Sequence, residues 1–184
     1  MDLSITKNNG TRELFNADRI NRSIERACKD LMDPISMVMQ IATETRLTLY
    51  DGMTTEEVDQ ATINAALQNV KDDIAYDKVA TRLLLKTIYR HVVKDYDKED
   101  EEDLAEKHQE CFPGYVEAGV AEGKLDKRML EKFDLKELSR ALKIERDELF
   151  QYAGLSTFLN RYSLKNMDQT PRETPQYFFM RVAM

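Results

Sequence analysis

The chain has 184 residues, 42% of them hydrophobic and 33% charged, and it contains neither an apolar run of the roughly 18 to 20 residues that span a bilayer nor a signal peptide. We therefore expect a soluble cytoplasmic protein that is not attached to a membrane. The net charge of −7 equals that of residues 95–110 alone, with nine acidic residues and two lysines, so the rest of the chain is neutral overall and nucleic acid is not expected as a partner.

A small β-hairpin is predicted at the start of the chain. Residues 3–6 and 13–15 have the β-branched and aromatic character of strands. Between them, Asn8-Asn9-Gly10 supplies the positive φ angles that a tight turn needs. A helix follows, which Asn16 or Asp18 can cap.

The hairpin and the helix together form a candidate anion site. The N-terminus of a helix carries a partial positive charge that favours phosphate. Lys7 and Arg19 add two full charges close to it in the sequence. The residues alone are equally consistent with an ordinary hairpin and helix bearing surface cations.

Four helices are predicted before residue 94. Pro34 suits the first turn of the second helix, and Thr54 with Glu57 can form a capping box at the start of the third. Apolar residues recur at helical spacing through each segment, and Cys28 falls on the buried face of the first helix. The predicted ranges are 18–32, 34–49, 54–70 and 74–93.

The second half of the chain is predicted to be less regular. The acidic residues 95–110 are expected to form a solvated linker. Phe112-Pro113-Gly114 is expected to break the chain, and short surface helices are predicted at 125–130 and 135–138. The two cysteines, Cys28 and Cys111, have no nearby cysteine partner, so no metal site formed by the protein alone is expected.

Three separated patterns in residues 1–94 occur in a familiar order. The first comprises Ile5, Lys7, Gly10, Glu13, Phe15, Asn16, Arg19 and Ile20. The second is Tyr50-Asp51-Gly52 followed by Thr55 and Val58, and the third is Ala80-Thr81-Arg82-Leu83 leading to Arg90. Together they resemble the ATP-cone, the nucleotide-sensing module of many ribonucleotide reductase large subunits.

The last forty residues carry a second resemblance. The segments 145–147, 150–155, 159–164 and 173–184 are similar in order and spacing to the start of the catalytic region of a class I ribonucleoside-diphosphate reductase large subunit. The resemblance implies a mainly α fold. It has an ATP-cone at 1–94, in which a small β-hairpin lies over a four-helix bundle, then the acidic linker at 95–110 and the helical start of the catalytic region at 111–184.

The resemblance also implies a site for ATP or dATP as effector, with Mg²⁺. Lys7, Arg19 and Arg90 match positions that meet phosphates. Glu13, Phe15 and Asn16 match positions around the base and ribose. Asn8 stands where many family members have arginine, and Asp59 where some have histidine. The complete set of implied site residues is Lys7, Asn8, Glu13, Phe15, Asn16, Arg19, Ile20, Thr55, Asp59 and Arg90.

By resemblance, the chain is expected to regulate deoxyribonucleotide biosynthesis through nucleotide-dependent oligomer assembly. The catalytic cysteines and the α/β barrel of the family are expected downstream of residue 184, so no catalysis is expected from this chain alone. Expected partners are the remainder of the large subunit and the radical-generating small subunit. The alternative is a degenerate cone that acts as a structural module, docking on a separate catalytic polypeptide through residues 177–180.

Overall fold

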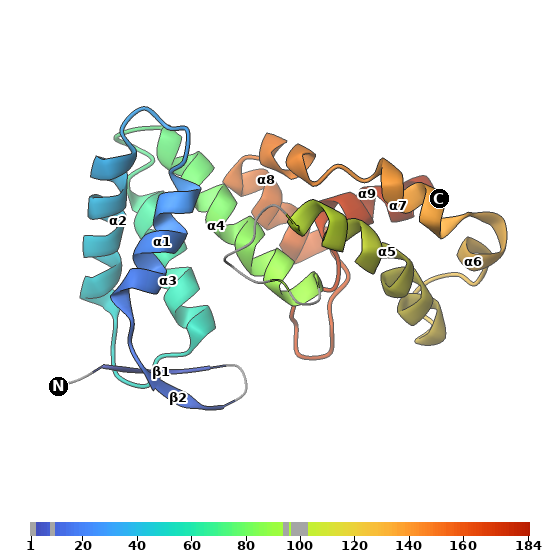
Figure 1. Ribbon diagram of the computed structural model, residues 1–184, viewed down its shortest axis with the longest axis horizontal. Coiled ribbons are helices and arrows are strands. Elements are labelled where there is room, and N and C mark those ends of the chain that lie inside the picture. The colour runs from blue at the N-terminus through green and yellow to red at the C-terminus, as the bar shows by residue number, and fades with distance from the viewer. Residues whose placement is uncertain (1–2, 8–9, 94–95, 97–102) are drawn as a thin grey trace. The chain divides into compact units, whose positions relative to one another are not determined.

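The computed structural model describes residues 3–7, 10–93, 96 and 103–184. Asn8 and most of the acidic stretch before residue 103 lie outside these described residues. The chain divides into two compact units, Met1–Leu84 and Leu85–Met184, which are described separately below. The predicted fold class is confirmed, because both units are mainly helical and the first begins with a β-hairpin (Figure 1).

The hairpin pairs β1 (Ser4–Thr6) with β2 (Arg12–Leu14) in antiparallel register, with Ile5 opposite Glu13. The other edge of β1 is also paired. The amide of Gly52 donates to the carbonyl of Ser4 at 2.9 Å, and the amide of Thr6 donates to the carbonyl of Met53 at 2.9 Å. The loop before α3 therefore satisfies backbone groups that a two-stranded hairpin would leave open on that edge.

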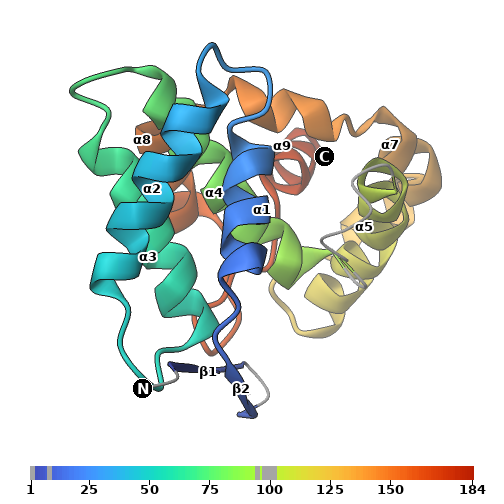
Figure 2. The ribbon, with the colours of Figure 1, turned by 60° about the vertical axis from the view of Figure 1, so that its left-hand side comes forward.

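Three helices of the first unit run alongside one another, with the hairpin at one end of them (Figures 1 and 2). Their apolar faces meet in a core whose fully buried members include Ile24, Ile41 and Ile63. A fourth helix, α4, contributes Val79 and Ala80 to the buried residues. The helices are α1 (Ala17–Ala27), α2 (Pro34–Thr48), α3 (Thr55–Gln68) and α4 (Ala75–Val92).

The local signals at the starts of these helices are confirmed. Asn16 caps α1 by accepting from the amide of Asp18 at 2.9 Å. Thr54 and Glu57 form the predicted capping box, in which the amide of Thr54 donates to Glu57 Oε2 at 2.7 Å. The predicted length of the first helix is wrong, however, because it ends at Ala27 and Asp30 has a φ of +67° that no α-helix accommodates.

The second unit is built around a buried cluster of aromatic and aliphatic side chains. At its centre lie Phe112, Tyr115 and Val116 from α5, together with Tyr177 from α9. The α-helices are the end of α4, α5 (Leu104–Ala121), α6 (Arg128–Lys132), α7 (Leu135–Ala141), α8 (Tyr152–Thr157) and α9 (Pro175–Ala183). A 3₁₀ turn, η1 (Ile144–Leu149), and a π-helical turn, η2 (Phe158–Tyr162), complete it.

The predicted chain break at Phe112-Pro113-Gly114 is wrong, because α5 continues through Pro113. Proline removes one helical hydrogen bond and usually ends or kinks a helix. Here Phe112 and Val116 are fully buried on either side of it, and Tyr115 is nearly so. The apolar contacts of these neighbours offset the local cost, so tertiary packing keeps the helix continuous. Residues 104–110, part of the predicted linker, form its first turns, and His108 is fully buried.

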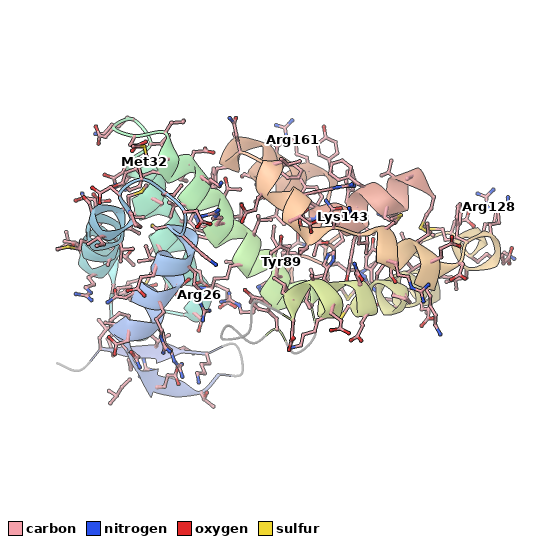
Figure 3. The ribbon with its side chains drawn as sticks, turned by 45° about the horizontal axis from the view of Figure 1, so that its top comes forward. Arg26, Met32, Tyr89, Arg128, Lys143 and Arg161 are labelled. Carbon is pink, nitrogen blue, oxygen red and sulfur yellow. The ribbon has the colours of Figure 1, made fainter. Side chains whose placement is uncertain are left out.

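The prediction of an exposed docking face at residues 177–180 is wrong for Tyr177. Tyr177 is fully buried, and its ring stacks on His108 with centroids 4.4 Å apart. Of the four residues, Phe179 is exposed, at 52%. Arg128 and Arg161 are both exposed and point outward from the second unit (Figure 3).

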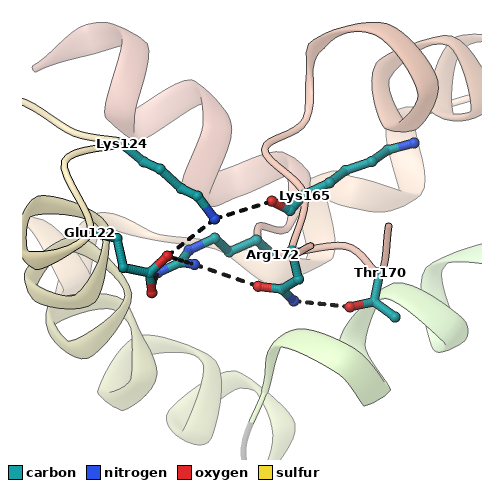
Figure 4. A network of polar contacts seen from close by, with 6 residues as sticks. Glu122, Lys124, Lys165, Thr170 and Arg172 are labelled. Atoms are coloured by element: carbon teal, nitrogen blue, oxygen red, sulfur yellow. Dashed lines mark hydrogen bonds and ion pairs between the residues drawn. The ribbon is translucent and has the colours of Figure 1, made fainter. Parts of the chain in front are cut away.

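An ion-pair network, in which Glu122 is 47% exposed and Arg172 is 11% exposed, joins the loop before α9 to the end of α5 (Figure 4). Arg172 donates to both carboxylate oxygens of Glu122 at 2.7 Å, and Lys124 lies 3.1 Å from the same carboxylate. The bonds from Arg172 and Lys124 lower the pKa of Glu122 to about 2. None of the described helices is both long enough and apolar enough to cross a membrane.

Buried polar side chains link α4, α5 and α9 in the second unit. The carboxylate of Asp147 accepts from the Tyr89 hydroxyl and from Gln176 Nε2, both at 3.0 Å. His108 Nε2 lies 2.8 Å from the Thr174 hydroxyl oxygen. Burial disfavours the charged form of each group. It raises the pKa of Asp147 to about 6 and lowers the pKa of His108 to about 4.

These two shifts predict opposing pH effects on stability. Asp147 binds its proton more tightly in the folded chain than at its ordinary pKa of 3.8, so its contribution to the free energy of unfolding falls as pH rises to about 6. His108 binds its proton less tightly than at its ordinary pKa of 6.5, so its contribution rises between about pH 4 and 6.5. Each effect amounts to about 2 to 3 kcal/mol.

Because the effects of Asp147 and His108 oppose each other in the original chain, variants that remove one group at a time should reveal each effect. The difference in free energy of unfolding between Asp147→Asn and the original chain should rise by about 2 to 3 kcal/mol from pH 4 to 6.5. The corresponding difference for His108→Gln should fall by a similar amount. Urea denaturation at a series of pH values measures both. Parallel pH profiles for the two variants would contradict the assignment.

Candidate functional site

Two cations converge on one carboxylate beside the hairpin. Lys7 Nζ lies 2.6 Å from Glu13 Oε2, and Arg19 Nη1 lies 2.8 Å from Glu13 Oε1. All three side chains are partly exposed, with 40% of Lys7, 37% of Glu13 and 56% of Arg19 accessible. The structure thus brings together three of the residues that the sequence predicted for a nucleotide site.

Local structure explains this convergence. Ile5 lies opposite Glu13 in the hairpin, and Lys7 follows Ile5 by two residues, so the period of a strand places Lys7 on the same face as Glu13. Arg19 lies in the first turn of α1, which begins directly after the hairpin. The Asn16 cap fixes the direction in which the chain enters that helix.

The electrostatics of the three residues favour an anion only modestly. The hydrogen bond from Lys7 is the main cause that lowers the pKa of Glu13, and the charge of Arg19 adds to it. Glu13 is therefore ionised at neutral pH, and the three charges sum to +1. A polyphosphate would find two cations here, but also a carboxylate already bound to them.

The start of α3 lies against the same hairpin. Thr54 forms a parallel bridge with Thr6, and the Thr55 hydroxyl lies 3.5 Å from the carbonyl oxygen of Thr6. Asp59 follows Thr55 by four residues, which places both on one face of α3. A second helix N-terminus, with a hydroxyl and a carboxylate on one face, thus lies next to the strand that leads into Lys7.

The remaining predicted site residues lie at several places in the chain, and their positions do not by themselves indicate a role in binding. Phe15 and Ile20 are half-buried, and the amide of Phe15 donates to the carbonyl of Leu3 at 2.8 Å. Arg90 lies in the last turn of α4 and belongs to the second unit. Asn8 lies outside the described residues. The roles of all ten predicted residues in binding a nucleotide stay predictions.

The sequence did not identify Ser4 as part of this region. Asp51 Oδ1 accepts from the Ser4 amide at 2.9 Å and from its hydroxyl at 2.7 Å, and these bonds lower the pKa of Asp51. Gly52, with a φ of +83°, turns the loop so that Asp51 can reach the strand. The sequence signal was the Asp51-Gly52 pair, which marks a turn but does not identify the strand that it contacts.

The side chains that the structure describes give little support to the binding of a metal ion by the protein alone. Within the described ranges, no group of three or more histidine, cysteine or acidic residues could hold a metal ion. Cys28 is fully buried in the first unit, and burial raises the pKa of its thiol to about 11. A thiol with so high a pKa stays protonated and unreactive at neutral pH.

Two protein families match separate parts of the chain. Residues 3–92 match the ATP cone domain family, and residues 148–184 match the all-alpha domain of ribonucleotide reductase.

Among characterised proteins, the chain is similar to the alpha subunits of ribonucleoside-diphosphate reductases. It is 32% identical to that of Helicobacter pylori over 99% of this chain and 22% of the relative. For the Chlamydia muridarum protein the identity is 36% over 73% of this chain and 12% of the relative. For the Escherichia coli protein it is 25% over 99% and 23%. The chain therefore spans less than a quarter of the length of each.

Proposed function

Because the chain corresponds to the N-terminal part of a ribonucleoside-diphosphate reductase alpha subunit, with an ATP cone followed by the start of the all-alpha domain, we propose that it binds ATP or dATP between the hairpin, α1 and α3. The observation that supports this most directly is the convergence of Lys7 and Arg19 on one carboxylate. Two cations held this close are suited to the adjacent oxygens of a triphosphate.

The two helix N-termini strengthen this site. Amides at a helix start and the helix dipole both favour phosphate, and α3 begins against β1 through Thr54 and Thr55. Magnesium would enter together with the triphosphate. Asp59, on the face of α3 that carries Thr55, is the carboxylate that would supply an oxygen ligand to it.

The role of this binding in the complete subunit is regulation of overall activity. ATP would favour the active assembly with the radical-generating small subunit, and dATP an inactive oligomer of alpha subunits. A ligand can shift such an equilibrium only by its differential affinity for the two states. The reduction of ribonucleotides itself would belong to the remainder of the alpha subunit.

Calorimetric titration of the chain with Mg²⁺-ATP and Mg²⁺-dATP tests the binding. Lys7→Ala should weaken the affinity roughly tenfold to a hundredfold, because a charge-assisted hydrogen bond to phosphate is lost. Lys71→Ala is the matched control, since Lys71 is exposed and follows the opposite end of α3; it should change the affinity less than twofold. Absence of heat for either nucleotide with the folded chain would refute the proposal.

A second candidate function is favoured by the carboxylate between the two cations. If Glu13 occupies Lys7 and Arg19 permanently, the cone would be a structural module that docks on the rest of the alpha subunit without responding to nucleotide. In that case co-purification with a separately expressed catalytic part would not depend on ATP. Nucleotide-dependent association would exclude this second function.

A further inference from the structure

We propose that Glu13 acts as an internal substitute for a phosphate group, which holds Lys7 and Arg19 together until a bound triphosphate displaces it. The inference rests on the proposed nucleotide binding and adds its regulation. The affinity of the site is then set by competition between the protein's own carboxylate and the ligand.

The geometry of the contacts carries the first step. Each oxygen of Glu13 receives one cation, Lys7 at 2.6 Å on Oε2 and Arg19 at 2.8 Å on Oε1. These are the charge-assisted hydrogen bonds that two oxygens of a phosphate group would accept from the same donors. The carboxylate and a phosphate therefore compete for one pair of cations.

The second step is that this bridge is weak enough to be exchanged. All three side chains are partly exposed to solvent, and exposed ion pairs contribute little to stability because water screens them. Arg19 contacts the carboxylate through Nη1, whereas its planar guanidinium can offer a two-pronged contact to phosphate. A triphosphate, with more charge and more acceptor oxygens, can replace the carboxylate.

The third step is that release of Glu13 leaves the backbone unchanged. The strands pair through backbone atoms at Ile5 and Glu13, and the amide of Lys7 donates to the carbonyl of Thr11 at 2.8 Å. Rotation of the Glu13 side chain alone frees both cations. The affinity of the site for phosphate can therefore be set by the Glu13 side chain without any change of fold.

The test uses Mg²⁺-tripolyphosphate, which has the phosphate groups of the effector but no base or sugar. Glu13→Gln keeps the size of the side chain and removes its charge. Glu25→Gln, on the exposed surface of α1, removes the same charge elsewhere in the same unit and is the matched control. Calorimetry should show roughly two- to tenfold tighter binding of tripolyphosphate to Glu13→Gln, and less than a twofold change for Glu25→Gln.

The outcomes separate this inference from the proposed function. Unchanged or weaker binding of tripolyphosphate to Glu13→Gln, or an equal gain in Glu25→Gln, would overturn the inference. If the original chain still binds Mg²⁺-ATP in that case, the proposed function stands. If neither the original chain nor Glu13→Gln binds ATP or tripolyphosphate, both proposals fail together. Circular dichroism of each variant establishes that it is folded.

Discussion

Replacing Tyr177 with alanine should lower the free energy of unfolding of the second unit by about 3 to 5 kcal/mol, as expected for a large aromatic side chain removed from a core. Tyr177 is fully buried, and its ring lies 5.3 Å from Phe112 and 5.1 Å from Tyr115, centroid to centroid. Its hydroxyl donates to the backbone carbonyl of His108. The alanine variant leaves a cavity at the point where α5 and α9 meet.

Phe179 supplies the control for this measurement, because it lies two residues further along the same helix and is 52% exposed. Phe179→Ala should lower the free energy of unfolding by less than about 1 kcal/mol. Tyr177→Phe, which loses only the hydroxyl, should lower it by about 1 kcal/mol. Guanidinium denaturation followed by circular dichroism compares the three. A loss in Phe179→Ala as large as that in Tyr177→Ala would show that the exposed face, and not the core, carries the stability.

Glu173→Ala should destabilise the second unit by a similar amount, about 3 to 5 kcal/mol, because it breaks a buried ion pair from one side. The Glu173 carboxylate is fully buried and accepts two bonds from Arg181, at 2.9 Å each. It also accepts from the Leu164 amide at 2.8 Å and from the Tyr115 hydroxyl. Removing it leaves these four donor atoms without their acceptor in a region from which water is largely excluded.

Two comparisons identify burial as the cause. Glu122→Ala also removes a carboxylate bound twice by an arginine, but Glu122 is 47% exposed, although Arg172 is only 11% exposed. The free energy of unfolding should therefore fall by less than in Glu173→Ala, by about 1 to 2 kcal/mol. The double variant Glu173→Leu, Arg181→Met should recover only part of the stability, because apolar residues replace both charges while the Leu164 amide and the Tyr115 hydroxyl stay without their acceptor. Equal losses in Glu173→Ala and Glu122→Ala would contradict the role of burial.

Contacts between residues close in sequence account for what was predicted correctly. The hairpin, the Thr54 capping box and the Asn16 cap join residues no more than about ten positions apart, so their chemistry can be read along the chain. The sequence also places Lys7 and Arg19 at a candidate anion site, which stays a prediction. What it did not indicate is that Glu13 binds both cations, since side-chain direction depends on the register of the strands and the start of α1.

The helical class, the hairpin, the helix starts and the resemblance to an ATP cone follow from the amino-acid sequence, because all of these depend on local propensity and on residue spacing. The continuation of α5 through Pro113 and the burial of Tyr177 depend instead on packing between distant segments. The same holds for the buried pairing of His108 with Thr174, 66 residues apart. The physical reason is the same in each case: burial against distant residues outweighs the local preference, and a linear pattern does not say which distant residues will meet.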